Sequence, residues 1–350
     1  MADTEDTVTM KQWLSFLTQQ GATITAGCAS SFGESAQDYP QRKAALCDLG
    51  DQGVLALEGP DSQKFLQGQS TSDTSQLDEN SSLPGAICNP KGRMLTSYQA
   101  IAPEKDKLLL VMHRPLVETT ISGVGKYAAF FKTSLSNASE KYRLLGVSGP
   151  DCESALEKLF DAIPQEINQL CINEACLLVR ISAQQFLFVV SVDAGQALWQ
   201  KLATSCTPTG DAYWQLQAIR AGLAQVKTAT FEQFVPQMLN LQATGAVNFK
   251  KGCYTGQEIV ARMQYLGKLK RRTYRVIIDT VTPPPVGAEI HAKADNKLVG
   301  NVLISAPANG TGSEILAVLH EDQAEASTLI IDGVTTGVRI AELPYSLSTN

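Results

Sequence analysis

The sequence predicts an α+β protein with two related lobes and a C-terminal β-barrel. Two stretches, VLALEGPDSQKFLQ at 54–67 and RLLGVSGPDCESALEKL at 143–159, share the pattern of an apolar strand, a Gly-Pro-Asp turn and an amphipathic helix. This repeat indicates two lobes built from similar units. After residue 272 short apolar strands alternate with turns, and the prolines at 283–285 exclude a helix or a central strand there. We therefore expect a small barrel over 273–350.

Further elements follow from hydrophobic periodicity and from capping and turn residues. Helices are expected at 9–19, 193–203 and 211–221. The last of these should stop at Gly222, because glycine favours the left-handed conformation that closes a helix. Strands are expected at 107–112, 175–181 and 185–192, the last two as a hairpin. The first lobe is expected over 1–135 and the second over 136–272.

Composition indicates a soluble protein of the cytoplasm. The 350 residues are 44% hydrophobic and 18% charged, which is ordinary for a globular chain of two or three domains. No apolar stretch is long enough to span a bilayer, so no membrane contact is expected. The N-terminal MADTEDTV is acidic, whereas a signal or transit peptide would be basic.

Cysteine and histidine usage argues against disulfides and metals. The eight cysteines form no C-x-x-C pair, and the three histidines lie apart from them in the sequence. A disulfide framework is not expected in a chain of this length without a secretion signal. We also expect no tightly bound metal, because no local motif has the ligand spacing of a zinc or cluster site.

The most informative stretch is KKGCYTGQEIVAR at 250–262, which contains a single cysteine, Cys253. Thr255 and Glu258 have the spacing of a capping box, so a helix is expected to begin there. Gly252 and Gly256 would allow the backbone to approach that helix closely. A thiol just outside a helix N-terminus and beside two lysines lies in positive potential, which favours the thiolate.

The same stretch opens a basic strip. Residues 250–275 contain eight basic side chains and one acidic side chain, in a chain of net charge −6. Such a strip predicts a local anionic partner, and the alternative is a solvated charged face. Tyrosines at 254, 265 and 274 are its only aromatic residues, too few for a convincing platform on which nucleic-acid bases could stack.

The run NLQATGAVNFKKGCYTGQE at 240–258 closely resembles the signature of the YgfZ family of folate-binding proteins, in the aminomethyltransferase (glycine cleavage T-protein) superfamily. The likeness continues, in the order expected for the family, through FLQGQSTSD (65–73), CNPKGRM (88–94), GKYAAFFK (125–132), IRAGLA (219–224), FVPQ (234–237) and LPYSLS (343–348). The resemblance implies that the two α+β lobes are partly interleaved in sequence and that the barrel completes a ring with a central folate cleft.

The resemblance also implies a function. Members of the family are implicated in making or repairing iron–sulfur clusters, including those of enzymes that modify tRNA. It implies tetrahydrofolate or a derivative as cofactor, and iron–sulfur assembly factors or client enzymes as partners. The leading prediction is a folate-binding accessory protein for iron–sulfur cluster assembly or repair, with an indirect effect on tRNA modification.

Site residues follow from the match to the family motif. Cys253 is expected to be the catalytic residue, and the folate contacts are expected from Trp214, Gln52, Lys251 and Arg262. An indole offers a flat face for a pterin ring, although this chain lacks a second family tryptophan, which would align near Gln52. The structural alternatives are a packed helix tryptophan and a buried, inert cysteine. The shape of the motif is assigned to Gly252, Tyr254, Thr255, Gly256, Gln257 and Glu258.

Two other functions compete with the leading prediction. One is a folate-dependent one-carbon transferase resembling the aminomethyltransferases, and the other is a nonenzymatic tRNA-binding module. Asn89 and Pro90 stand where the aminomethyltransferases carry a catalytic carboxylate, and neither can act as a base, which argues against glycine cleavage. If the protein is catalytic, a one-carbon or sulfur-related transfer is expected.

Overall fold

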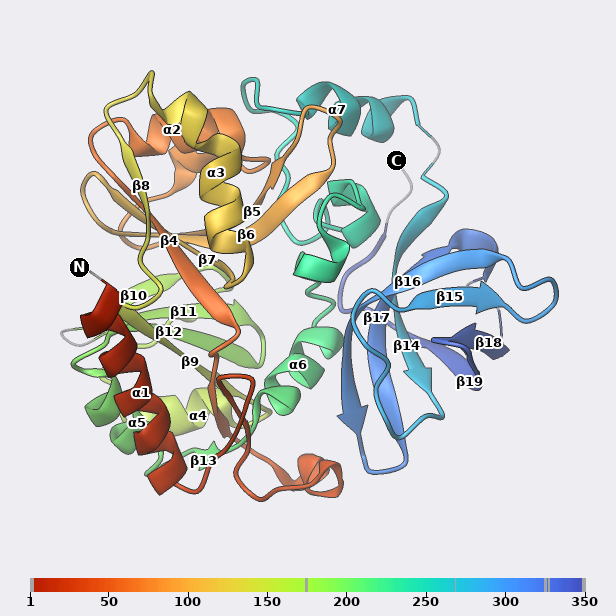
Figure 1. Ribbon diagram of the computed structural model, residues 1–350, viewed down its shortest axis with the longest axis horizontal. Coiled ribbons are helices and arrows are strands. Elements are labelled where there is room, and N and C mark those ends of the chain that lie inside the picture. The colour runs from red at the N-terminus through yellow and green to blue at the C-terminus, as the bar shows by residue number, and fades with distance from the viewer. Residues whose placement is uncertain (1–2, 174–175, 268, 324–325, 327, 348–350) are drawn as a thin grey trace. The chain divides into compact units, whose positions relative to one another are not determined.

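The computed structural model describes residues 3–173, 176–267, 269–323, 326 and 328–347 (Figure 1). Residue 175 of the strand predicted at 175–181 and residue 348 of LPYSLS lie outside the described residues. Within the described part of the chain, no helix is both long and apolar enough to cross a bilayer.

The chain forms two compact units that alternate along the sequence. The first unit comprises Met1–Ser62, Leu77–Leu83 and Gln99–Gln217, and the second comprises Gln63–Gln76, Pro84–Tyr98 and Ala218–Asn350. The lobe boundaries predicted from the sequence stay predictions.

A six-stranded sheet forms the centre of the first unit. Its order is β10 (Leu170–Asn173), β11 (Cys176–Ser182), β12 (Gln185–Ser191), β9 (Tyr142–Ser148), β3 (Ala45–Asp48) and β13 (Thr207–Pro208). β11 and β12 pair as the predicted antiparallel hairpin. The helices α1 (Asp3–Gln19), α4 (Cys152–Glu157) and α5 (Gly195–Leu202) and the short hairpin β1 (Thr23–Thr25) and β2 (Cys28–Ser31) belong to the same unit.

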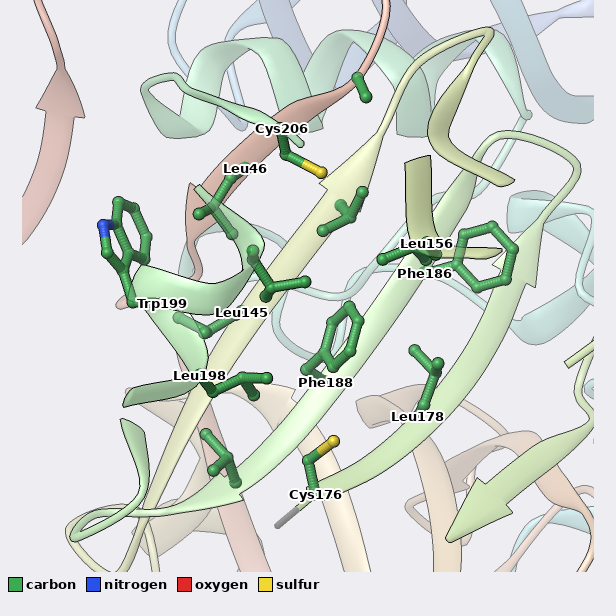
Figure 2. Packing of buried hydrophobic residues seen from close by; sticks show 14 of the residues in the cluster. Leu46, Leu145, Leu156, Cys176, Leu178, Phe186, Phe188, Leu198, Trp199 and Cys206 are labelled. Carbon is green, nitrogen blue, oxygen red and sulfur yellow. The ribbon is translucent and has the colours of Figure 1, made fainter. Parts of the chain in front are cut away.

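Alternating side chains of β12 build the core of this unit. Phe186 and Phe188 point to one face of the sheet, because successive residues of a strand face opposite sides. They join Trp13 of α1, Leu46 of β3 and Trp199 of α5 in one buried cluster. Figure 2 shows Leu46, Phe186, Phe188 and Trp199 of this cluster. Two helices and two strands that are far apart in the sequence are thereby fixed to one another.

A five-stranded sheet contains the other half of the repeat. Its order is β5 (Ser82–Cys88), β6 (Met94–Glu104), β7 (Lys107–His113), β4 (Gln52–Glu58) and β8 (Ser134–Asn137). The neighbouring helices in the sequence are α2 (Ser62–Gln69) and α3 (Leu116–Ala128), and α6 (Asp211–Arg220) follows later in the chain. α6 stops two residues before Gly222, whose φ of +69° is left-handed as expected.

The repeated Gly-Pro-Asp turn has the same construction in both copies. Gly59 after β4 and Gly149 after β9 both have positive φ, at +133° and +118°. A Cβ atom at either glycine would clash with a lysine carbonyl, that of Lys132 in the first copy and that of Lys43 in the second. The aspartate two residues later donates its amide hydrogen to the same carbonyl. Glycine is therefore required at both turns, and the sequence repeat is also a structural repeat.

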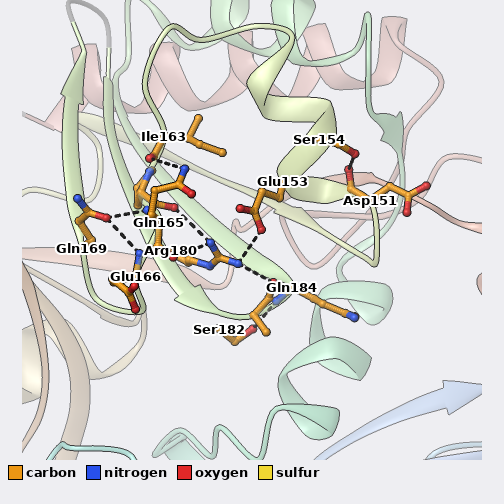
Figure 3. A network of polar contacts seen from close by, with 12 residues as sticks. Asp151, Glu153, Ser154, Ile163, Gln165, Glu166, Gln169, Arg180, Ser182 and Gln184 are labelled. Carbon is orange, nitrogen blue, oxygen red and sulfur yellow. Dashed lines mark hydrogen bonds and ion pairs between the residues drawn. The ribbon is translucent and has the colours of Figure 1, made fainter.

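Arg180 fixes the loop that follows the second copy of the repeat. Its guanidinium donates to Oε2 of Glu153 at 2.8 Å and to the carbonyl of Gln165 at 2.8 Å (Figure 3). Gln169 accepts the amide hydrogen of Gln165 at 2.6 Å, which closes the loop. These bonds connect α4 to β11, and they give Arg180 a structural role.

The second unit ends in a closed six-stranded barrel, as the sequence predicted. The strand order is β14 (Arg271–Ile278), β17 (Gly312–His320), β16 (Leu298–Ala308), β15 (Glu289–Ala292), β18 (Thr328–Ile331) and β19 (Val334–Ala341), which pairs again with β14. The interior contains branched side chains such as Val276, Ile290 and Ile315. The three prolines lie between β14 and β15, outside any strand.

A buried carboxylate joins two arginines at the barrel. Glu314 is 4% exposed, and its two oxygens accept from different guanidinium groups. Oε1 accepts from Nε and Nη2 of Arg220 at 3.1 and 2.8 Å. Oε2 accepts from Nε of Arg275 at 2.9 Å and pairs with its Nη2 at 2.7 Å. Each oxygen thus contacts two nitrogens of one guanidinium, and charge-assisted contacts of this kind are stronger than neutral hydrogen bonds.

Glu314→Gln is expected to lower the free energy of unfolding by about 2–3 kcal/mol, because both arginines lose their shared countercharge. Chemical denaturation measures this difference. The exposed Glu342→Gln serves as the control and should change stability by less than about 0.5 kcal/mol. Equal stability of the two variants would contradict a structural role for the triad.

Candidate functional site

Three of the sequence motifs meet in the second unit. They are the 67–72 segment after α2, the 88–94 hairpin between β5 and β6, and the thiol motif at 250–258, which precedes α7 (Gln257–Tyr265). Hydrogen bonds and close backbone contacts at two glycines connect the three motifs. More than 170 residues separate the first of these motifs from the last, so only the fold brings them together.

The side chain of Lys251 anchors the thiol motif. Its Nζ donates to the carbonyls of Gln67, Ser70 and Ser72 at 2.7, 2.7 and 2.8 Å. The residue is only 8% exposed, and burial lowers the pKa of the ammonium to about 8, against which the charge of Asp73 acts. The group therefore remains protonated at pH 7, with its three hydrogens directed at three carbonyls. This geometry favours a structural role for Lys251 over the expected folate contact.

Helix α7 begins one residue later than the capping-box spacing predicted. Its N-cap is Gly256, with φ of +86°, and no side chain caps it, so the capping box predicted from Thr255 and Glu258 is not formed. Thr255 instead bonds to the last turn of α2, with its amide on the carbonyl of Gly68 at 3.2 Å and its hydroxyl on Oε1 of Gln69 at 3.3 Å. Glu258 is exposed in the first turn, where its charge complements the helix dipole.

Two glycines allow the 88–94 hairpin to contact the start of α7. A Cβ at Gly256 would lie 2.5 Å from the carbonyl oxygen of Asn89, and a Cβ at Gly92 would lie 2.9 Å from Cβ of Ile259. Any side chain at either position would separate the two segments. Gly252 differs from them, because the space around it is open and its φ is not left-handed.

Asn89 shapes the turn of the hairpin. Its Oδ1 accepts from the amides of Lys91 at 2.9 Å and Arg93 at 3.1 Å, and its Nδ2 donates to Glu232 at 2.8 Å. Asn89 therefore forms the turn of this hairpin. Lys91 and Arg93 are exposed.

Cys253 differs from the other seven cysteines in its exposure. All eight cysteines lie in the described part of the chain and are free, and Cys253 alone is exposed. Burial raises the pKa of each of the others, for instance to about 12 in Cys88 and Cys206. A thiol must be accessible and form the thiolate to act as a nucleophile, so Cys253 is the cysteine best placed to react.

The neighbours of the cysteine are held firmly. Tyr254 is buried, burial raises the pKa of its hydroxyl, and the ammonium of Lys251 lies 5.1 Å from its ring centroid. Gln257 opens α7, and Arg262 is exposed in its last turn. The exposed thiol therefore lies on a segment whose two flanks are fixed by buried contacts.

Trp214 and Gln52 lie in the first unit, whereas the thiol motif lies in the second. Trp214 is half-buried on α6, with its indole against β9, since a Cβ at Gly146 would lie 2.5 Å from that ring. Gln52 begins β4, and its side-chain amide donates to Asp51 at 3.1 Å. Of the four predicted folate contacts, Lys251 and Arg262 thus lie in the second unit with Cys253, whereas Trp214 and Gln52 lie in the first.

Gln52 also lines a polar cavity of about 20 Å³ that sequence analysis missed. Asp48, 3% exposed, accepts from Nε1 of Trp13 at 3.0 Å, and burial raises the pKa of its carboxyl to about 6. Among the described residues, its second oxygen and the Nε and Nη2 of Arg143 have no hydrogen-bond partner. The sequence signal for this cavity was Arg143, a charged residue inside the otherwise apolar strand YRLLGVS.

Part of the basic strip is paired within the fold. Arg272 pairs with Glu321 and Arg275 pairs with Glu314, whereas Arg271 keeps its charge and donates to the uncharged His320 at 2.8 Å. Among the described residues, two cations of the strip are therefore paired with carboxylates, and Lys251 is buried. The prediction of one continuous anionic partner along 250–275 is therefore weakened.

No group of three or more His, Cys, Asp or Glu side chains that could bind a metal ion occurs in the described ranges.

Comparison with known proteins identifies the class. Residues 36–210, half of the chain, match the family model described as the GCVT N-terminal domain, which belongs to the glycine cleavage T-protein superfamily. The chain is 33% identical over 309 residues to the tRNA-modifying protein YgfZ of Photorhabdus laumondii subsp. laumondii, covering 87% of this chain and 93% of that protein. The chain belongs to the YgfZ family.

A solved structure confirms the fold class. The glycine cleavage system aminomethyltransferase T from Bartonella henselae matches with a TM-score of 0.77 and 17% identity, covering 95% of this chain and 96% of that one. At this level of identity the likeness establishes the shared fold, including the predicted α+β body with its C-terminal barrel.

Lys251→Met is expected to lower the free energy of unfolding by about 3 kcal/mol, because three buried carbonyls lose a charged donor. The neighbouring Lys250→Met is a matched control, since Lys250 is exposed, and it should change stability by less than about 0.5 kcal/mol. Urea denaturation compares the two. A loss in Lys251→Met no larger than that of the control would show that the three contacts do not stabilise the fold.

Asp48 is expected to make stability depend on pH. Its folded pKa of about 6 exceeds its ordinary value of 3.8, so between these values the native state binds more protons than the unfolded chain. Its contribution is fully present below about pH 4 and is lost as pH rises through 6, a change of about 2–3 kcal/mol. Asp48→Asn should remove this part of the pH dependence, measured by denaturation from pH 4 to 7.5. The exposed Asp161→Asn should retain it, and identical profiles for both variants would refute the assignment.

Proposed function

We propose that this protein is a folate-binding accessory factor for iron–sulfur cluster assembly or repair, and that Cys253 is its reactive group. The proposal rests on one observation. Cys253 is exposed on a segment with fixed flanks, whereas burial raises the pKa of every other cysteine. The YgfZ relative from Photorhabdus is named a tRNA-modifying protein, and membership of the same family supports a link to tRNA modification. The eight free thiols support a reducing compartment such as the cytoplasm.

Folate is proposed as the cofactor from the superfamily and from the chemistry of the first unit. The half-buried indole of Trp214 offers an aromatic face. Gln52 is kept as a proposed folate contact, because a side-chain amide can hydrogen-bond the edge of a heterocycle. Arg262, exposed on α7 of the second unit, stays a predicted folate contact from the family motif. Bound folate would supply one-carbon chemistry, whereas these residues would bind and orient it.

The two competing functions have less support. A one-carbon transferase of the aminomethyltransferase type needs a carboxylate where Asn89 instead forms a turn. A tRNA-binding module needs free cations along the strip, whereas Arg272 and Arg275 are paired with glutamates. Turnover of methylene-tetrahydrofolate by the purified protein, or tRNA affinity that falls with salt, would favour these alternatives.

The proposal predicts that ligand binding and thiol function separate. Calorimetric titration with tetrahydrofolate should show that Trp214→Ala weakens binding at least tenfold, while Cys253→Ala binds within twofold of wild type. Cys253→Ala should nevertheless fail to restore an iron–sulfur enzyme in cells that lack this protein, whereas Cys171→Ala, at a half-buried thiol, should restore it. Full rescue by a stably folded Cys253→Ala protein would remove the thiol from the mechanism. Absence of saturable tetrahydrofolate binding would remove the cofactor.

A further inference from the structure

A groove of about 260 Å³ lies at the C-terminal end of α7, in the second unit. It is lined by Met238, Met263, Leu269, Lys270, Arg271 and His320. These residues come from the 3-10 turn Pro236–Leu239, from α7, from the start of β14 and from the end of β17. None of them belongs to the thiol motif or to the proposed folate contacts.

The floor of the groove is apolar and adaptable. Met238, Met263 and Leu269 supply it, and thioether side chains adjust to differently shaped partners. The adjoining end of α7 exposes two further large side chains, Tyr265 at 67% and Leu266 at 83%. These two side chains follow the groove-lining Met263 in the sequence, and exposed apolar surface marks sites of protein interaction. The groove is also smaller than the roughly 300–1,000 Å³ of ligand pockets, which favours a single inserted side chain over a cofactor.

The rim of the groove is positive. Lys270 is exposed, and Arg271 carries the second charge. His320 adds none at neutral pH, because its Nε2 accepts from Nε of Arg271 at 2.8 Å and because burial and Arg271 lower its pKa. The imidazole also lies in the fields of Lys297 and Asp322, whose charges offset one another. The groove therefore complements a partner with carboxylates around an apolar side chain.

We propose that this groove docks an acidic peptide segment of a partner protein. One large apolar side chain of the segment would occupy the groove, and its carboxylates would contact Lys270 and Arg271. Methionine, tyrosine and arginine are enriched in such interfaces. A nucleic-acid partner fits less well, because the next two arginines along the strand direction, Arg272 and Arg275, are already paired with glutamates.

Docking at this groove would bring a partner close to the reactive thiol. α7 has nine residues, so its two ends are about 13 Å apart. Cys253 lies just before one end, and the groove lies at the other. The binding test below uses neither folate nor the thiol, so it can fail or succeed independently of the proposed function.

The test is a selection of random twelve-residue peptides, displayed on phage, against the full-length protein. The best peptide is then titrated by fluorescence anisotropy against wild type, Met263→Asp and Lys270→Glu. Lys105→Glu, an exposed site in the first unit, provides the same change of charge away from the groove. Circular dichroism verifies that each variant is folded.

Selected peptides should carry aspartate or glutamate around one aromatic or large aliphatic residue. Each groove variant should weaken binding at least tenfold, the Lys105→Glu control by less than twofold, and salt should weaken it further. Failure to select any binding peptide, or peptides that bind the groove variants as tightly as wild type, would overturn the inference. Displacement of the peptide by indole-3-acetate, with an affinity equal to that of the peptide, would also overturn the inference, because the groove would then be a small-molecule site.

Discussion

The contact between the ammonium of Lys251 and three main-chain carbonyls organises the surroundings of the reactive cysteine. A buried cation must be paired or fully hydrogen-bonded, and here Gln67, Ser70 and Ser72 provide the acceptors while the charge of Asp73 favours the ammonium. The contact fixes the 67–72 segment beneath the thiol motif, two residues from Cys253. Thr255, on the other side of the cysteine, also bonds to the end of α2. Exposure and rigidity therefore coexist at the thiol because its neighbours, and not the cysteine itself, are buried.

The start of α7 depends on a second constraint, the close approach of Gly256 and Gly92. Their missing side chains let the 88–94 hairpin lie against the helix, with the turn held by Asn89. The side chain of Asn89 is used for hydrogen bonds to the backbone, so its role in this hairpin is structural.

Features that depend on local sequence were predictable, whereas those that depend on distant partners were not. The barrel was predicted because alternation and proline placement are local properties, and the exposed thiol followed from the character of its motif. The role of Lys251 was missed because its acceptors precede it by about 180 residues. The capping box failed for a related reason, since Thr255 bonds to Gln69 and leaves the cap to Gly256. The basic strip was overestimated because its arginines pair with glutamates about 40–50 residues later.

The repeated Gly-Pro-Asp turn bears on how this protein can change over evolution. Each copy leads into a helix whose C-terminal side is bound by a cation. A carbonyl at the end of α2 accepts from Lys251, and a carbonyl in the loop after α4 accepts from Arg180. Only the first loop adjoins the cysteine. The second copy is tied instead to Glu153 and the strand β11. Both turns require glycine, but the loop after the second copy can change without altering the surroundings of the thiol, whereas changes in the first copy would affect both the stability and the thiol motif.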